Sequence, residues 1–335
     1  MPSHPDASHP GTPDANARLM GRWAGASGHR RLLPHLRAHH GIGFWLAHAA
    51  VLLAMLLIAT EAQAQQGTGL RETYAQLANQ LARSPFQRPI VLESEDNTAH
   101  PTGDMHAVVA HPFDRLGGAL RQVRAWCDIL TLPANVKRCT VDDAQSRSPT
   151  VHLSVGRKFD QPIEDAYALD FRFQVIADQP QYLLVEMSAP KGPMGTSNYR
   201  LTLEAVPLDA GRSFIRLRYA YVNGTAARFA TSAYLATAGR DKVGFTIVGR
   251  ESNGAPRFVG GIQGIAERNT MRYFLAIESY LDTLSAPQDQ RLDRRLRDWF
   301  LATERYARQL HEQSLEEYLT MKHKEARMQV VQASL

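Results

Sequence analysis

The stretch Leu169-Asp170-Phe171-Arg172-Phe173-Gln174-Val175 alternates apolar and polar side chains without a break. Successive side chains of a β-strand point to opposite faces, so this period of two predicts a strand with one apolar and one polar face. The pattern returns in three later segments, at residues 182–187, 199–206 and 214–221. Residues 150–221 therefore predict an antiparallel meander whose apolar face must be covered by another element.

The predicted cover is a helix at residues 266–284. Its apolar side chains recur every three or four residues, which is the spacing of one helical face. They are Met271, Phe274, Leu275, Leu281 and Leu284. Shorter periodic segments predict helices at 70–81, 113–126 and 225–238, and strands at 90–93, 105–110, 136–141, 243–248 and 257–262.

From Gln288 to Met328 the sequence is charged and helical, with a narrow apolar stripe formed by Leu292, Leu296, Trp299, Tyr306 and Leu310. We expect this segment to fold back on the domain; pairing with another chain, or standing partly free, are the alternatives. The predicted organisation is a leader at residues 1–64, a main domain at 65–286 and a charged helical extension at 287–335.

The leader has the features of a secretory signal. A basic lead with Arg30, Arg31 and Arg37 precedes an apolar run at residues 49–59 and the small-residue segment Glu61-Ala62-Gln63-Ala64-Gln65. The apolar run is short for a transmembrane helix, although an uncleaved anchor is the alternative. The sequence therefore predicts export across the inner membrane to the periplasm.

The charge balance is mildly basic, at +5 for the whole chain. Residues 1–64 contain five arginines and three acidic residues, so the remainder carries +3. Lys and Arg are scattered and no nucleic-acid motif is present, so no DNA or RNA partner is predicted.

The two cysteines, Cys127 and Cys139, lie in the exported part. An oxidising compartment favours a disulfide between them, which would stabilise the fold by about 3 kcal/mol through loop closure. Two free thiols are the alternative. A zinc site would need two more ligands, and His106 and His111 form no recognisable pattern with the cysteines.

The order of the predicted elements resembles that of the START-like superfamily (SRPBCC, helix-grip), which includes lipid-transfer domains and polyketide cyclases. Two segments carry the likeness, Met105-His106-Ala107-Val108-Val109-Ala110-His111-Pro112-Phe113-Asp114-Arg115-Leu116 and Trp126-Cys127-Asp128-Ile129-Leu130. The insertion at 239–261 and the charged tail depart from the family's simplest plan. The resemblance implies an α+β fold in which a curved antiparallel sheet grips the long C-terminal helix around a cavity for an apolar small molecule.

Inward-facing positions of the strands and the last helix are the predicted ligand-binding residues. They are Phe171, Phe173, Tyr182, Leu184, Tyr199, Leu201, Tyr219, Tyr221, Met271, Phe274 and Leu275. A shift of one residue in any strand would exchange its lining residues for their neighbours. A fully packed core built from the same side chains is the alternative.

No nucleophile, metal or cofactor signature is present, so no catalytic residue, metal site or cofactor is predicted. An enzyme of cyclase or hydrolase type is the alternative function, with His111, Asp128, Lys158 or Asp160 as acid–base groups. Charged residues on the polar strand faces are expected to form cross-strand ladders; they are Asp170, Arg172, Glu186, Arg200, Glu204, Arg216 and Arg218.

The function predicted from the sequence is an exported binding or transfer protein for an apolar small molecule, such as a lipid. A basic rim near residues 240–272 suits transient contact with an anionic membrane surface, and an ordinary mixed surface is the alternative. A further alternative is an envelope scaffold, in which the helix at 288–328 mediates oligomerisation or binds a partner.

Overall fold

The computed structural model describes residues 67–142, 144–237 and 239–333. The predicted signal sequence at residues 1–64 lies outside them. None of the described helices combines the length and the apolar character that crossing a membrane requires.

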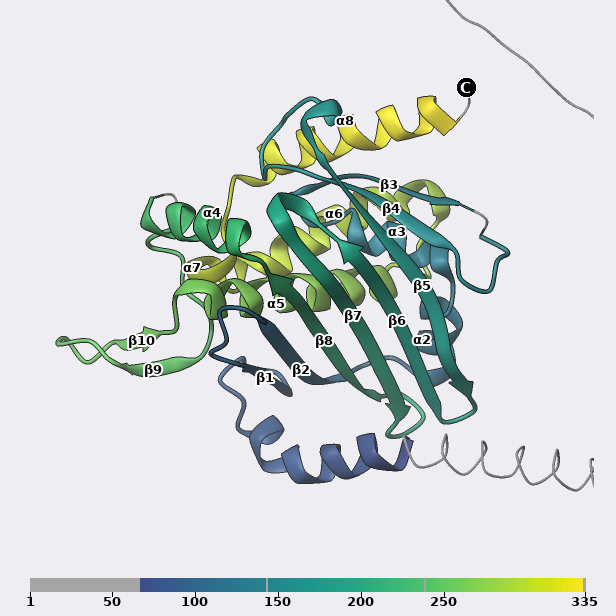
Figure 1. Ribbon diagram of the computed structural model, residues 1–335. Coiled ribbons are helices and arrows are strands. Elements are labelled where there is room, and N and C mark those ends of the chain that lie inside the picture. The colour runs from purple at the N-terminus through teal and green to yellow at the C-terminus, as the bar shows by residue number, and fades with distance from the viewer. Residues whose placement is uncertain (1–66, 143, 238, 334–335) are drawn as a thin grey trace, which may run out of the picture. The chain divides into compact units, whose positions relative to one another are not determined.

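An eight-stranded antiparallel sheet forms the body of the fold, with strand order β1-β2-β8-β7-β6-β5-β4-β3 (Figure 1). The six strands from β3 to β8 follow one another as a meander, and β2 and β1 extend the sheet beyond β8. The strands are β1 (Ile90–Ser94), β2 (Thr102–Val109), β3 (Val136–Asp142), β4 (Thr150–Val155), β5 (Tyr167–Gln179), β6 (Tyr182–Lys191), β7 (Thr196–Pro207) and β8 (Ser213–Asn223). The predicted meander is confirmed.

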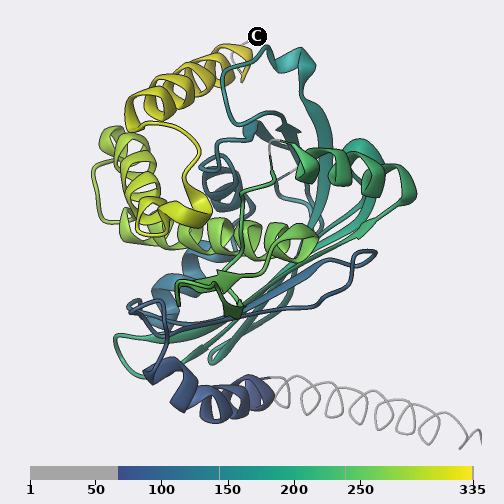
Figure 2. The same ribbon diagram turned by 90° about the vertical axis from the view of Figure 1, so that its left-hand side faces the viewer.

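The long helix α5 (Gly261–Asp282) lies across the inner face of the curved sheet (Figure 2). Met271, Phe274 and Leu275 are buried against inward side chains of the strands, in one core. Gly103 of β2 permits close contact, because a Cβ there would meet the Thr270 hydroxyl at 2.2 Å. The predicted α+β, helix-grip arrangement is confirmed.

The outer face of the sheet is covered at one end by the helix at residues 67–82. Leu70, Leu77 and Leu81 of this helix pack on Val206 and Phe214 in a second, smaller core. The sheet is therefore apolar on both faces in this region.

This second core overturns part of the predicted lining. Tyr182 belongs to it and Leu184 packs against it, whereas Leu183 and Val185 face α5. The prediction that Tyr182 and Leu184 face the helix is wrong by one residue, because alternation alone cannot assign a face when both faces are apolar.

Elsewhere the outer face is polar, as predicted. Arg216 pairs with Asp104 at 2.5 Å and with Glu204 at 3.6 Å, and Arg200 pairs with Glu186 at 2.8 Å. These cross-strand pairs form the expected charge ladder.

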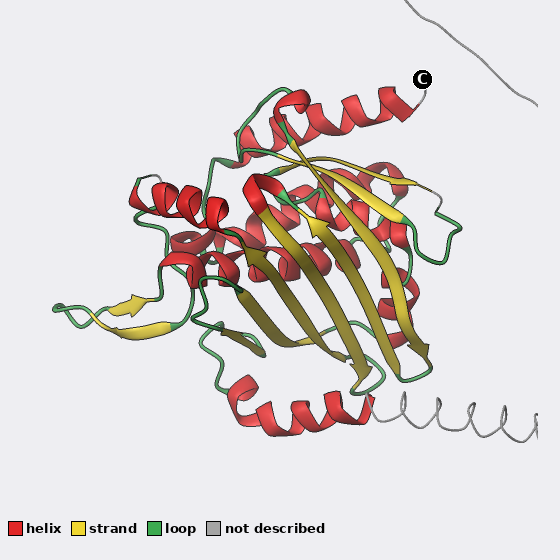
Figure 3. Ribbon diagram, viewed as in Figure 1, coloured by secondary structure: helices red, strands yellow, loops and turns green. Residues whose placement is uncertain are grey.

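The single helix predicted at 113–126 is two helices, α2 (Phe113–Leu120) and α3 (Val123–Leu130) (Figure 3). The chain leaves helical geometry at Gln122, whose ψ is 118°. Trp126 Nε1 donates to the carbonyl of Leu120 at 2.8 Å. A side chain of α3 thus stabilises the turn by hydrogen-bonding the C-terminal end of α2. Such tertiary bonds are not visible in helical periodicity.

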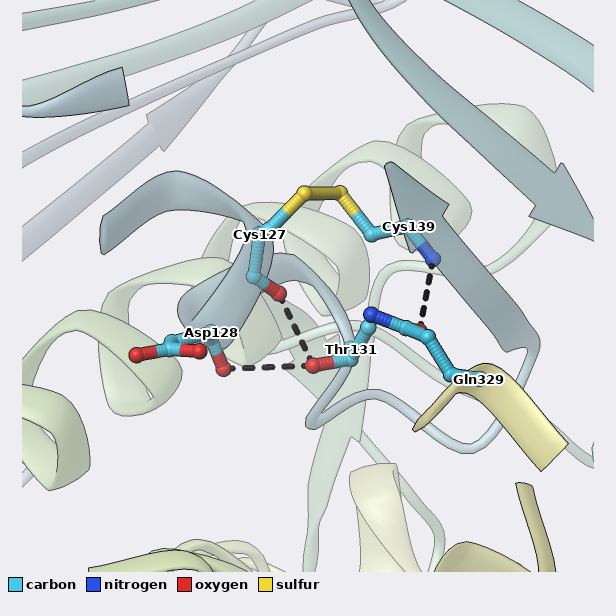
Figure 4. Close-up of a disulfide and its surroundings, with 5 residues drawn as sticks. All are labelled: Cys127, Asp128, Thr131, Cys139 and Gln329. Carbon is cyan, nitrogen blue, oxygen red and sulfur yellow. Dashed lines mark hydrogen bonds between the residues drawn. A yellow bond between two sulfur atoms is a disulfide. The ribbon is translucent and has the colours of Figure 1, made fainter. Parts of the chain in front are cut away.

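Cys127 of α3 and Cys139 of β3 form the predicted disulfide (Figure 4). The backbone N–H of Cys139 also donates to the side-chain oxygen of Gln329 at 3.2 Å. The disulfide therefore joins α3 to the sheet next to the C-terminal helix.

The C-terminal segment consists of three helices, α6 (Gln288–Glu304), α7 (Ala307–Leu310) and α8 (Leu315–Ala333), rather than one. They fold back on the domain, which was the first of the three expectations. Trp299 Nε1 donates to the carbonyl of Arg272 at 3.2 Å, and the Tyr318 hydroxyl donates to the carbonyl of Leu132 at 2.7 Å.

The insertion after β8 contains the helix α4 (Thr225–Ala236) and a hairpin of β9 (Ile247–Arg250) and β10 (Pro256–Phe258). Two short 3₁₀ turns, η1 (Ile163–Asp165) and η2 (Pro193–Gly195), precede β5 and β7. Helix α4 was predicted at nearly these bounds, and strands β9 and β10 are each shorter than predicted.

Candidate binding site

A cavity of about 230 Å³ lies between the sheet, α5 and the cover formed by α4 and η2. Strands β3, β4, β5, β7 and β8 supply its wall on one side, and α5 supplies the other. The cavity occupies one end of the space between sheet and helix. The remainder of that space is filled by the main core.

Four tyrosines line the cavity: Tyr199, Tyr219, Tyr221 and Tyr273. The rings of Tyr199 and Tyr221 are stacked with centroids 5.2 Å apart, and those of Tyr219 and Tyr273 are 5.4 Å apart. Burial raises the pKa of all four phenols above the usual range, so each stays neutral at physiological pH. The wall thus offers flat apolar rings edged by hydroxyl groups.

The polar part of the wall comes from α5. The side chain of Asn269 hydrogen-bonds the Tyr219 hydroxyl. Arg272 Nη1 donates to the side-chain oxygen of Asn269 at 3.5 Å, and Arg272 Nη2 donates to Glu312 at 2.5 Å. A continuous polar chain therefore runs from a cavity tyrosine to the loop between α7 and α8.

Glu312 joins four segments around this end of the domain. Its carboxylate pairs with Arg272 and Lys158, each at 2.5 Å, and with Lys242 at 3.4 Å. Burial of the carboxyl raises its pKa, but Lys158, Arg272 and Lys242 outweigh burial and hold the pKa below the usual range. One carboxylate thus pairs with three basic side chains, so the cluster around Glu312 carries a net positive charge.

One of the two lysines that pair with Glu312, Lys158, has an unusually low pKa. Burial, assisted by Arg272, lowers the pKa of Lys158 to about 7, although Glu312 acts in the opposite direction. Its side chain is still 34% exposed, so reagents can reach it.

We therefore expect Lys158 to react with an acylating reagent with a rate that rises through pH 7 and then levels off, because only the neutral amine is nucleophilic. Its folded pKa lies below its ordinary value of 10.5, so the unfolded chain binds more protons between the two values and Lys158 favours folding as pH rises from 7. Peptide mapping after brief acylation between pH 5 and 10 measures the rate, with the exposed Lys191 as internal reference. The same pH profile at both lysines would contradict this prediction.

The cover of the cavity depends on a close approach of two backbones. A Cβ at Gly224, just before α4, would lie 2.7 Å from the carbonyl oxygen of Gly195, so only glycine fits there. Met194 has a φ of 55°, in the left-handed region that a side chain rarely adopts. It lines the cavity and is 55% exposed, so it lies at the boundary between cavity and solvent.

Three of the predicted ligand-binding residues, Tyr199, Tyr219 and Tyr221, line this cavity. The other inward residues are packed in the core and do not line it: Phe171, Phe173, Leu201, Met271, Phe274 and Leu275. Tyr182 and Leu184 lie on the opposite face of the sheet. The alternative of a packed core therefore describes most of the interface between sheet and helix, and the cavity is confined to the end beneath α4.

Sequence reasoning missed Asn269, Arg272 and Tyr273. The sequence pattern predicts a helix and a basic surface here, because the spacing of these residues does not distinguish them from a solvated helix face. Ala227 and Thr231 of α4 were also missed, although the small residues of that segment indicated a helix packed on an apolar surface.

The four acid–base candidates are not brought together, and none lines the tyrosine cavity. His111 lies 2.9 Å from Asp282, and Asp160 pairs with Lys324. Asp128 pairs with Arg295, and Lys158 with Glu312. A cyclase or hydrolase would need a buried acid–base pair inside the cavity. These four residues do not form one.

The chain matches no family model and no curated protein. Among solved structures it is similar to norcoclaurine synthase from Thalictrum flavum, with 14% identity, 39% of this chain and 75% of that chain covered, and a TM-score of 0.30. An aromatase/cyclase, ZhuI, from Streptomyces sp. R1128 has 13% identity, 62% and 95% coverage and a TM-score of 0.29. A START superfamily protein from Mycobacterium smegmatis has 11% identity, 42% and 92% coverage and a TM-score of 0.27.

The class of the chain follows from its own architecture, an open curved antiparallel sheet around a long C-terminal helix. It is an α+β, helix-grip fold. Its candidate site is a small tyrosine-lined cavity beneath α4.

Proposed function

We propose that this chain is an exported START-like protein that binds one apolar small molecule in the tyrosine-lined cavity and carries it without covalent chemistry. The observation that carries the proposal is the cavity itself, with four tyrosine rings facing one space between sheet and helix. START-like folds generally bind small apolar ligands, and a concave apolar site with a few polar groups is the usual form of such a site.

The size of the cavity limits the ligand. At about 230 Å³ it is below the roughly 300–1,000 Å³ of pockets for drug-sized molecules. The proposed ligand is therefore a molecule of one or two rings, or the end of a single lipid chain. A lipid with two chains would enter only if α4 and η2 moved away from α5.

The proposed location is the periplasm, with transient contact to a membrane surface during loading or release. The leader supports export, and the disulfide between Cys127 and Cys139 suits an oxidising compartment. Phe229 of α4 is 80% exposed beside Arg228, which gives the cover an apolar and basic outer surface.

A cavity-filling substitution tests the proposal. Ala227 is buried and lines the cavity, so Ala227→Trp fills it, whereas Ala233→Trp places the same ring on the exposed face of α4. Isothermal titration with 2-naphthol, a two-ring probe, is expected to show one site per chain that Ala227→Trp weakens at least about tenfold and Ala233→Trp leaves unchanged, since tenfold corresponds to only about 1.4 kcal/mol. Equal affinity in the two variants would place the probe elsewhere and contradict the proposal.

A further inference from the structure

A second cavity, of about 500 Å³, lies between α3, α6 and α8 and is separate from the tyrosine-lined cavity. Its wall is formed by side chains from these three helices, from Thr131 at the end of α3 and from Lys137 of β3. They are Asp128, Thr131, Lys137, Gln288, Arg291, Leu292, Arg295, Leu296, Lys322, Glu325, Ala326 and Gln329. Figure 4 shows the side chain of Gln329 of α8 at the backbone N–H of Cys139, beside the disulfide.

Positive charge is in excess around this cavity. The lining contains four cations, Lys137, Arg291, Arg295 and Lys322, and its only acidic members are Asp128 and Glu325. Three of the cations are almost completely buried, with 3% of Lys137, 4% of Lys322 and 6% of Arg295 exposed.

The two lysines share one carboxylate. Glu325 accepts from Lys322 Nζ at 2.6 Å and lies 3.0 Å from Lys137 Nζ. Lys137 also donates to the carbonyls of Ala134 and Phe159, at 3.0 and 2.9 Å. Lys322 donates to the carbonyl of Val136 at 2.8 Å. These carbonyls satisfy hydrogen bonds but supply no net charge.

The arginines lie on α6. Arg295 Nη1 pairs with Asp128 at 2.8 Å, and its guanidinium lies 4.4 Å from the ring centre of Tyr280. Arg291 donates to the carbonyls of Ala286 and Leu284. Since Asp128 is 54% exposed, water screens the charge it offers to Arg295.

A buried charge without a counter-charge is unfavourable by several kcal/mol, so a protein either neutralises the group or places an opposite charge beside it. Burial, with Lys137 nearby, lowers the pKa of Lys322, and Glu325 opposes the shift. A cavity next to these groups leaves room for the missing negative charge.

We propose that the cavity between α3, α6 and α8 binds a small oxyanion with more than one negative charge, either inorganic phosphate or sulfate or the phosphoryl group of a small metabolite. Thr131, Gln288 and Gln329 add neutral polar groups to the same wall. The volume of about 500 Å³ exceeds that of one inorganic ion, so a phosphate ester also fits.

The test adds the negative charge by mutation. Gln329→Glu is nearly isosteric and keeps an oxygen for the Cys139 N–H, so it places a carboxylate in the cavity with little change of shape. Gln290→Glu makes the same substitution at an exposed position of α6 outside the cavity. Ala326→Glu is a second variant within the cavity, for the case that Gln329→Glu does not fold.

Isothermal titration of the full chain with inorganic phosphate, at constant ionic strength in chloride, is expected to show one saturable site per chain. Gln329→Glu or Ala326→Glu should weaken this binding at least about tenfold and raise the melting temperature of the phosphate-free protein, because the new carboxylate replaces the anion. Gln290→Glu should change neither value.

Titration with glycerol 3-phosphate distinguishes the two sources of the anion: tighter binding of the ester indicates a phosphorylated metabolite, and tighter binding of phosphate indicates the free ion. Absence of saturable binding of both compounds by the wild-type chain would overturn the proposal. It would also be overturned if Gln329→Glu and Gln290→Glu bound phosphate equally. Neither result bears on the tyrosine-lined cavity, which is tested separately.

Discussion

Replacing Glu325 with Gln is expected to lower the free energy of unfolding by about 3–5 kcal/mol, the usual effect of removing one partner from a buried ion pair. Glu325 is 6% exposed and is the carboxylate shared by Lys137 and Lys322. The neutral amide cannot balance two buried ammonium groups. Chemical denaturation monitored by circular dichroism measures the change.

The matched control is Glu316→Gln, at an exposed position in the first turn of the same helix. We expect this variant to unfold with nearly the wild-type free energy. Replacing Lys137 and Lys322 with Met and Glu325 with Leu should restore much of the stability, because apolar groups of similar volume can substitute for a buried ion cluster. Equal stability of Glu325→Gln and Glu316→Gln would show that the lysines are neutral or hydrated in the folded protein.

Replacing Glu312 with Gln is expected to destabilise the protein by about 2–3 kcal/mol at neutral pH, a range typical of hydrogen bonds to charged groups. Arg272, Lys158 and Lys242 all pair with this carboxylate, and Arg272 is buried. Partial exposure of the two lysines keeps the expected effect below that of Glu325→Gln. The same substitution should also weaken ligand binding, because Arg272 lines the tyrosine cavity.

The pH dependence of this loss of stability tests whether the charge of Glu312 causes it. The folded pKa of Glu312 lies below its ordinary value of 4.5, so its contribution is present above that value and is lost as pH falls through the folded pKa. The difference between wild type and Glu312→Gln should therefore be largest near neutral pH and shrink in acid. Glu251→Gln, at an exposed turn, is the control. A difference that stayed constant down to pH 2 would point to packing rather than charge.

The sequence predicted the sheet and its cover because both depend on local periodicity. The alternation from Leu169 to Phe173 and the stripe of α5 each mark one apolar face, and the fold unites those faces. Alternation failed at Tyr182 and Leu184, where the helix at 67–82 covers the outer face and makes both sides of β6 apolar. A strand that is apolar on both faces shows no alternation of apolar and polar residues, so its sequence does not indicate which side chains face the helix.

The ion pairs of the site could not be predicted from the sequence, for a different reason. Arg272 and Glu312 are 40 residues apart in the chain and meet only through the packing of the C-terminal segment on α5. Lys322 and Glu325 have the three-residue spacing of an ordinary surface pair on a helix. Their burial follows from the position of α8 on β3, which no local pattern encodes.

The central claim is that the tyrosine-lined cavity holds a small apolar molecule, and native mass spectrometry of the protein purified from the cells that naturally produce it tests this claim most directly. We expect the wild-type chain to carry one small molecule per chain, which is lost on gentle activation and absent from Ala227→Trp. Repeated preparations in which the wild-type mass equals that of the bare chain would contradict the claim.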